Sequence, residues 1–171
     1  MIKLPEGVLL DNYRNADLNK PEEAQALLTK ILNLWSEMAD QPQLFGDDGL
    51  RDPRKFGQWI TAPDTVVLKT PFGYVFVVRI VPDMRAEVHL YIKDHKLSAH
   101  ADLLKECLIW GFLTFNLTRV ETFLPSHAFT VKRFLVDRMG FKYEGRMRSR
   151  VKLQGQFIDT EIFSILREEV L

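Results

Sequence analysis

The 171-residue sequence is poor in the features that mark secreted, membrane and nucleic-acid-binding proteins. Its single cysteine, Cys107, cannot form a disulfide within the chain, and its start, MIKLPEGVLL, lacks the charged head and long apolar core of a secretory signal. Basic and acidic residues number 23 each, so no net charge favours nucleic acid or an acidic membrane. No apolar run approaches the roughly 20 residues of a membrane span. We therefore expect a cytoplasmic protein that binds neither nucleic acid nor membrane.

Metal-binding patterns are also missing. The four histidines and Cys107 show no metal-ligand spacing, and Cys107 falls in an apolar helical stripe, where a buried thiol is the ordinary role. By contrast, 46% of the residues are hydrophobic, which is enough apolar surface for one core without metal or disulfides. The sequence predicts one domain over residues 1–171 and no metal site.

Periodicity predicts the elements of the first half. Apolar residues recur at helical spacing after Pro21, and a shorter helix is predicted behind Asp52 as its N-cap, with Pro53 in its first turn. Alternating apolar positions then predict an antiparallel hairpin over residues 65–81 and a third strand over 86–92.

In the second half, the pattern predicts a long buried helix over residues 98–115, with Asn116 as a left-handed cap. A strand over 119–125 and a helix over 128–139, ended by Gly140, follow, and the last two strands turn at Gln154 and Gly155. This order predicts an α/β (α+β) fold, with a mixed sheet on which helices pack.

The C-terminal half, from residue 111 to 169, resembles the ribosomal-protein-type enzymes of the Gcn5-related N-acetyltransferases (GNATs). In that branch a helix ends before a Leu and an Arg-Val-Glu strand, and a later helix runs into Gly-Phe and Glu-Gly-Arg. The matching residues are Leu117, Arg119, Val120, Glu121, Gly140, Phe141, Glu144, Gly145, Arg146, Gly155, Asp159, Arg167, Glu168 and Glu169. The resemblance implies a GNAT-like, mostly antiparallel sheet flanked by helices.

The resemblance also implies a reaction, the transfer of an acetyl group from acetyl-coenzyme A (acetyl-CoA) to an amine of a small molecule or a protein. Such an enzyme holds the thioester, removes a proton from the ammonium group and stabilises the oxyanion that forms. In this family the fourth strand donates backbone amides to the pantetheine arm. Here that strand is 86–92, and the amides would be those of Leu90, Tyr91 and Ile92.

Two polar residues of this strand are candidates for the catalytic base. Glu87 comes first and His89 second, because alternation places both on one face and either can accept a proton directly or through water. A polar face exposed to solvent, or a hydrogen-bonded pair of Glu87 with His89, explains the same residues without catalysis. Many family members protonate the leaving thiolate with a tyrosine where this sequence has Leu135 or Val136, so no such acid is expected.

The segment after this strand departs from the family pattern Q/R-x-x-G-x-G/A, in which bare amides at a helix start wrap the pyrophosphate. Leu97 stands at the arginine, and His100 and Asp102 stand at the later small positions. A carboxylate about 4 Å from a phosphate costs on the order of 4 kcal/mol in a partly screened site. Compensating charge is available from Lys93, His95, Lys96 and His100. The residues expected to contact the cofactor are Ser98, Ala99, His100 and Ala101, with His127 ahead of the later helix.

Two functions remain open from the sequence. The first is an N-acetyltransferase that uses acetyl-CoA, with an acceptor selected partly by the segment 40–53. The second is a non-catalytic protein of the same fold that binds a protein partner, for example as a phage assembly factor. The second function predicts an occluded cleft.

Overall fold

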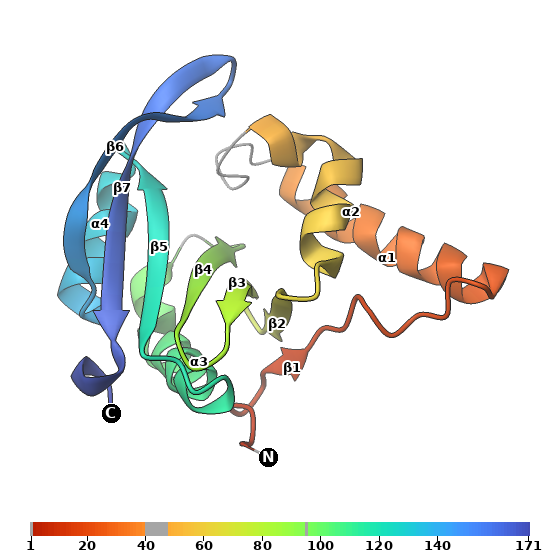
Figure 1. Ribbon diagram of the computed structural model, residues 1–171, viewed down its shortest axis with the longest axis horizontal. Helices are drawn as coiled ribbons and strands as arrows, with labels where there is room; N and C mark the ends of the chain where they lie inside the picture. The colour runs from red at the N-terminus through yellow and green to blue at the C-terminus, as the bar shows by residue number, and fades with distance from the viewer. Residues whose placement is uncertain (1, 40–47, 95) are drawn as a thin grey trace.

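The computed structural model describes residues 2–39, 48–94 and 96–171, and its elements follow the predicted order (Figure 1). The helices are α1 (Pro21–Ala39), α2 (Pro53–Thr61), α3 (Ala101–Thr114) and α4 (Phe129–Phe134). The main strands are β2 (Val66–Thr70), β3 (Gly73–Val81), β4 (Arg85–Ile92), β5 (Arg119–Pro125), β6 (Lys142–Leu153) and β7 (Gln156–Leu166). A two-residue strand, β1 (Leu9–Leu10), pairs with β2 and was not predicted, because two residues carry no readable alternation.

The helix ends agree with the sequence at three places and differ at one. Asp52 caps α2, and its side chain accepts a hydrogen bond from the Arg54 amide at 2.9 Å. Asn116, just after α3, and Gly140 both have positive φ; Gly140 ends the π-helical turn η4 (Leu135–Met139), which continues α4 to the predicted end of that helix. The helix predicted from residue 98 instead begins with a 3-10 turn, η3 (Leu97–His100), before α3. No side chain caps either start, so the tighter turn accommodates the free amides.

The seven strands form one sheet in the order β1-β2-β3-β4-β5-β7-β6. Neighbouring strands are antiparallel except β4 and β5, which pair in parallel only from Arg85 with Arg119 to Glu87 with Glu121. Beyond Glu87 the two strands diverge, as Figure 1 shows. The mixed, mostly antiparallel sheet that the sequence predicted is therefore confirmed.

Helices cover both faces of the sheet and create two cores. One core joins α3 and α4 to the sheet through buried residues such as Leu104, Phe112 and Phe134. The other joins α1 and α2 to the opposite face through residues such as Leu34 and Phe56. No helix of the described residues is long and apolar enough to cross a membrane.

The residues that carried the family resemblance cross-link the sheet at the point of divergence. Arg119 pairs with Glu121 at 3.1 Å and with Glu144 at 3.0 Å, while Arg85 pairs with Glu121 at 3.0 Å. These ion pairs connect β4, β5 and β6. They hold the three strands together beside the point of divergence.

Candidate functional site

The peptide groups of β4 divide between two neighbours. The Lys93 amide donates to the Phe72 carbonyl oxygen at 2.9 Å, and bonded positions in an antiparallel pair recur at every second residue. This register directs the peptide groups of Tyr91 to β3 and those of Leu90 and Ile92 toward β5. Because the pairing with β5 ends at Glu87, no described strand takes up the groups of Leu90 and Ile92. The gap therefore presents backbone donors and acceptors to a ligand.

A cleft of about 680 Å³ lies between turn η3 and α4, and we call it the α4 cleft. Ser98 and Ala99, two of the predicted contact residues, are part of its wall. Its charged residues are three cations and one carboxylate, with Arg133 and Asp137 4.0 Å apart. The full lining is Lys96, Leu97, Ser98, Ala99, Phe129, Thr130, Arg133, Phe134, Asp137 and Arg138. The α4 cleft thus favours an anionic ligand.

The side chain of His100 is turned toward Asp94 and Phe72. Its Nε2 lies 2.9 Å from an Asp94 carboxylate oxygen, and its ring stacks on Phe72 with centroids 3.9 Å apart. Asp94 also accepts a hydrogen bond from the Lys96 amide, and these two bonds, the amide bond first, hold the pKa of Asp94 below its usual range. The Asp94 carboxylate thus occupies one amide of the turn that would otherwise be free.

The other predicted contacts are not part of the α4 cleft. Ala101 is buried in the core, Asp102 is exposed, and His127 is exposed in the turn before α4. Of the basic residues expected to compensate, Lys96 lines the cleft, while Lys93 forms an ion pair with Glu37. His95 lies outside the described residues. The expected repulsion from Asp102 therefore loses its geometric basis, because its carboxylate is not in the cleft wall.

A second, smaller pocket of about 180 Å³ adjoins β4 on the face of α1 and α2, and we call it the His89 pocket. It draws residues from the turn η2 (Asp48–Arg51), α2 and five strands. The lining consists of Leu50, Trp59, Arg79, Glu87, His89, Phe123, Pro125, Arg150, Val151 and Thr160. Residues 40–47 of the segment expected to select the acceptor lie outside the described residues.

Glu87 and His89 form a hydrogen-bonded pair within this pocket. The buried Glu87 carboxylate bonds His89 Nε2 through one oxygen and Arg79 Nη1 through the other, both at 2.9 Å. Burial opposes ionisation of Glu87, but the bond from His89 and the charges of His89, Arg79 and Arg150 outweigh it, so its pKa is lowered. Since an ionised carboxylate only accepts hydrogen bonds, Nε2 carries the proton and Nδ1 of a neutral ring is left as an acceptor. Within the pair, both Glu87 oxygens are occupied, whereas His89 keeps one ring nitrogen that Glu87 does not bond.

The shared face of β4 is confirmed. Glu87, His89 and Tyr91 point away from α3, while Val88, Leu90 and Ile92 pack into the core beneath it. The Tyr91 hydroxyl donates to the Glu37 carbonyl oxygen at 3.2 Å, which is a structural bond. At the place of the family tyrosine, Leu135 is buried and Val136 is an exposed aliphatic side chain, so neither can donate a proton.

Three residues of the His89 pocket escaped sequence analysis. Arg79 has φ +49° at a bulge of β3, and Ser149 has φ +49° at a bulge of β6, directly before Arg150. Bulges redirect side chains, and no regular alternation announces them. Thr160, on β7, is buried, and its hydroxyl has no hydrogen-bond partner in the described part of the chain.

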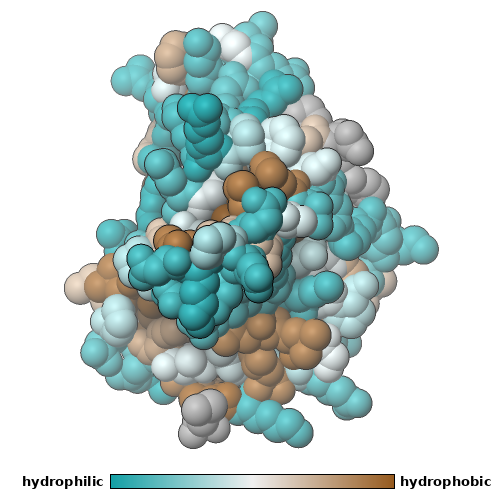
Figure 2. Space-filling model, turned by 90° about the vertical axis from the view of Figure 1, so that its right-hand side faces the viewer, coloured by the Kyte–Doolittle hydropathy of each residue, from teal (hydrophilic) through white to brown (hydrophobic). Residues whose placement is uncertain are grey.

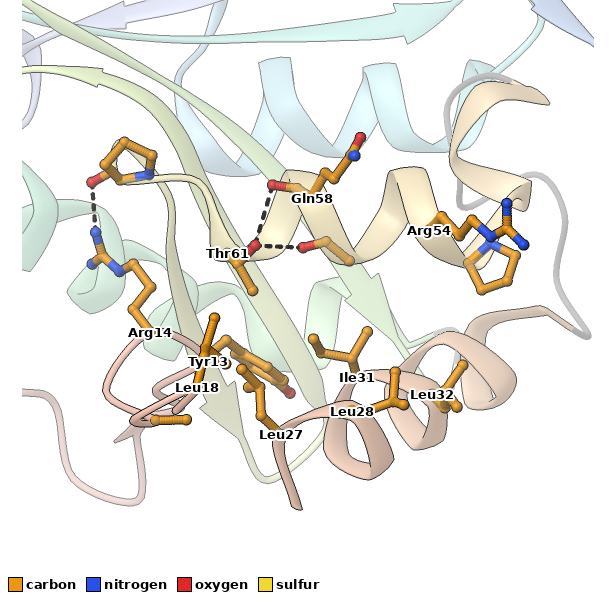
Figure 3. A pocket seen from close by; sticks show the side chains of 14 residues that line it. Tyr13, Arg14, Leu18, Leu27, Leu28, Ile31, Leu32, Arg54, Gln58 and Thr61 are labelled. Atoms are coloured by element: carbon orange, nitrogen blue, oxygen red, sulfur yellow. Dashed lines mark hydrogen bonds between the residues drawn. The ribbon is translucent and has the colours of Figure 1, made fainter. Parts of the chain in front are cut away.

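A larger groove of about 770 Å³ lies between α1 and α2 (Figure 3). Leucine side chains, including Leu18, Leu28 and Leu32, make up much of its lining, and the molecular surface on this side carries hydrophobic patches among polar side chains (Figure 2). At one end of the groove, Arg14 donates a hydrogen bond to the Pro63 carbonyl oxygen. The pKa of the neighbouring Tyr13 is raised by burial and by its hydrogen bond to Asp11. The groove holds no acid–base pair. Elsewhere in the described chain, no cluster of His, Cys, Asp and Glu could hold a metal ion.

Comparison with solved structures identifies the fold. A probable acetyltransferase matches with a TM-score of 0.66 and 14% identity over 98% of this chain and 97% of its own. A spermidine N-acetyltransferase from Vibrio cholerae, solved with CoA and spermine, matches with a TM-score of 0.63 and 16% identity over 97% and 99% of the two chains. The chain has the GNAT fold. The ribosomal-protein branch that the sequence pointed to is not distinguished by these GNAT matches.

Sequence comparison reaches less of the chain. No family model matches it. An uncharacterized N-acetyltransferase of Bacillus licheniformis is 30% identical over 70 residues, which is 40% of this chain. The match spans only 38% of that relative's length. The assignment of the GNAT fold therefore rests on the comparison of three-dimensional structures, and the partial sequence match supports it.

Proposed function

We propose that this protein is an N-acetyltransferase that moves an acetyl group from acetyl-CoA to an amine. The observation that carries the proposal is the gap between β4 and β5, into which the peptide groups of Leu90 and Ile92 are turned. A thioester arm can bond to such groups in the manner of an added strand. The gap adjoins β4, which also contributes to the His89 pocket on the other face.

The α4 cleft fits the phosphates of acetyl-CoA through side-chain charge. Lys96, Arg133 and Arg138 line it, and guanidinium groups bind phosphate through paired N–H donors. These cations take over the task that glycine amides perform in the family pattern. The Asp94 carboxylate, bonded to the Lys96 amide, removes one amide at the start of the turn from use.

His89 is the base in this proposal, and Glu87 is the residue that positions it. The neutral His89 ring accepts a proton from the ammonium group of the acceptor through Nδ1 or through a water. The freed nitrogen lone pair forms the C–N bond, the nitrogen then releases a second proton to solvent, the C–S bond breaks, and sulfur keeps the electron pair. Its proton comes from solvent, because neither Leu135 nor Val136 can supply one.

The open clefts also weigh against the non-catalytic alternative. An interaction protein that had abandoned catalysis is expected to have filled the old site, whereas clefts of about 680 and 180 Å³ border β4 and α4 here. An amine as the acceptor agrees with the spermidine N-acetyltransferase of similar fold.

The test combines binding with turnover. Calorimetric titration with acetyl-CoA should give saturable binding, and addition of amines should release free CoA thiol. The variant His89→Gln should keep the affinity for acetyl-CoA and lose most of the thiol release. Absence of saturable binding at millimolar acetyl-CoA, together with no amine-dependent thiol release, would refute the proposal.

A further inference from the structure

We propose that the acceptor is a small amine that also carries a carboxylate, and that Arg150 and Thr160 bind this carboxylate. The inference rests on the proposed acetyl transfer and names its substrate class. It starts from the charges of the His89 pocket, which are those of Arg79, Glu87, His89 and Arg150.

The single carboxylate of the pocket is already used. Glu87 bonds Arg79 through one oxygen and His89 through the other. Arg150 is left without an ion-pair partner among the described residues. Its guanidinium lies 4.4 Å from the centre of the Phe123 ring and reaches only the Met147 sulfur, at 3.8 Å. The pocket therefore has one cation in excess, with its planar face held by Phe123 and its N–H groups available to a carboxylate.

Thr160 supplies a second, independent indication of a ligand. It is 2% exposed, lines the His89 pocket, and its hydroxyl has no partner within residues 2–39, 48–94 and 96–171. A buried hydroxyl without a partner destabilises the fold unless something bonds to it. A carboxylate oxygen placed between Thr160 and Arg150 would accept from both.

The backbone is distorted in both strands that bring arginines to the pocket. Arg79 itself and Ser149, the neighbour of Arg150, are non-glycine residues with left-handed φ at bulges of β3 and β6. A left-handed φ at a non-glycine residue strains the backbone, and a bulge changes the direction of the side chains beside it. Two separate distortions thus serve one pocket.

Size and charge argue against a polyamine. The volume of about 180 Å³ corresponds to about six water molecules at about 30 Å³ each. A long polycation would exceed this space and meet the charge of Arg150. A compact amine with a carboxylate two to four atoms away fits both the volume and the charge.

The experiment compares amines matched in length and opposite in charge. Glycine, β-alanine and γ-aminobutyrate are assayed against ethylenediamine, 1,3-diaminopropane and 1,4-diaminobutane by CoA thiol release. We expect the best amino acid to exceed its matched diamine at least tenfold in kcat/KM. Arg150→Gln should bring that ratio close to one. Arg148→Gln, an exposed change on the same strand outside the pocket, should leave it intact.

Thr160→Val separates ligand binding from folding. Because the Thr160 hydroxyl has no partner among the residues that the structure describes, its removal should leave the melting temperature unchanged or higher, while the KM for the amino acid rises severalfold. A lower melting temperature with unchanged KM would assign the hydroxyl a purely structural role and count against the inference.

The outcomes separate this inference from the proposed function. Turnover that favours diamines, or a preference for amino acids that survives Arg150→Gln, would overturn the inference and leave the acetyltransferase standing. If acetyl-CoA neither binds nor reacts, the proposed function fails. Calorimetric titration with the same amines then still decides about the pocket, because binding of the amino acids should require Arg150 in either case.

Discussion

The Asp48 carboxylate accepts a hydrogen bond from the Gly155 amide at 2.9 Å and a second from the neighbouring Gln154 amide at 2.8 Å. Asp48 belongs to the turn η2 before α2, whereas Gln154 and Gly155 form the tip of the β6–β7 hairpin (Figure 1). Both tip residues have positive φ, which lets the turn present successive amides to one anion. The contact ties the hairpin that carries Arg150 and Thr160 to the turn that carries Leu50, and so braces the His89 pocket.

Loss of this contact should loosen the pocket without affecting the α4 cleft. We expect Asp48→Ala to raise the KM for the acceptor severalfold and to leave the affinity for acetyl-CoA unchanged. Hydrogen exchange should accelerate at the amides of Gln154 and Gly155, because their acceptor is gone. Unchanged exchange at both amides would contradict the bracing role.

The same contact predicts a dependence of stability on pH. The bonds from the Gly155 and Gln154 amides hold the pKa of Asp48 below its usual range. Its contribution is therefore complete above the unfolded-state pKa and is lost as the pH falls through the lower, folded-state pKa. Denaturant unfolding at acidic pH should give a smaller stability difference between wild type and Asp48→Asn than at neutral pH. An equal difference at both would argue against a charged Asp48 in the bond.

Substitution of His89 should lower the rate of acetyl transfer without changing the affinity for acetyl-CoA. We expect His89→Gln to lower kcat by roughly a hundredfold to ten-thousandfold, the usual worth of a positioned base. Glu87→Gln should cost less, and its pH–rate profile should shift, because His89 loses the carboxylate that orients it. Tyr91→Phe, which removes the hydroxyl that bonds the Glu37 carbonyl oxygen on the same face of β4, is the matched control. A Tyr91→Phe variant as slow as His89→Gln would show that the loss reflects general damage to β4.

Charge changes around the α4 cleft should reveal how acetyl-CoA is held. Arg133→Gln is expected to weaken binding by roughly tenfold, about 1.4 kcal/mol, and to reduce its dependence on salt. Asp102→Asn should change the affinity less than about twofold, because that carboxylate is not in the cleft wall. Calorimetric titrations at two salt concentrations measure both effects. A large gain on Asp102→Asn would restore the repulsion expected from the sequence.

Two glycines should respond in opposite directions to the same substitution. A Cβ at Gly73, where φ is +153°, would overlap the Tyr91 carbonyl oxygen, so Gly73→Ala should destabilise the fold by more than about 3 kcal/mol. At Gly111, inside α3, a Cβ meets nothing within 4 Å, and alanine should stabilise by about 0.5–1 kcal/mol. Thermal unfolding tests both, and equal effects would contradict the close approach of β3 and β4 at Gly73.

The regular elements could be predicted because their side chains repeat. The alternation at Glu87, His89 and Tyr91 and the cap at Asp52 are written in neighbouring residues, and both are confirmed. The match to the GNAT fold also followed from residues at the Arg119 junction. Helix α3 began later than predicted, because capping at its start could not be read from residue types alone.

The pockets could not be predicted in the same way. The His89 pocket takes residues from seven elements, and Arg79 and Arg150 reach it through bulges that no sequence period marks. The direction of His100 depends on Phe72 and Asp94, and no residue pattern pairs either of them with His100. The cationic lining of the α4 cleft was missed because Lys96, Arg133 and Arg138 are separate basic residues that resemble ordinary solvent-exposed surface in the sequence.

The parallel pairing of β4 with β5 is only three residues long, so the two strands are joined at one end and separate toward the other. Glu87 and Ile92 lie about 16 Å apart along β4 at about 3.3 Å per residue, so a small rotation of β4, together with its partner β3, against β5 changes the width of the gap more at Leu90 and Ile92 than at Glu87. The ion pairs of Arg85 and Arg119 with Glu121 hold the two strands together at the joined end. In the proposed enzyme, the width of the gap that admits the thioester is therefore set at these ion pairs, away from acetyl-CoA and from the amine. A substitution of Arg85, Arg119 or Glu121 should change the access of acetyl-CoA and of the amine together.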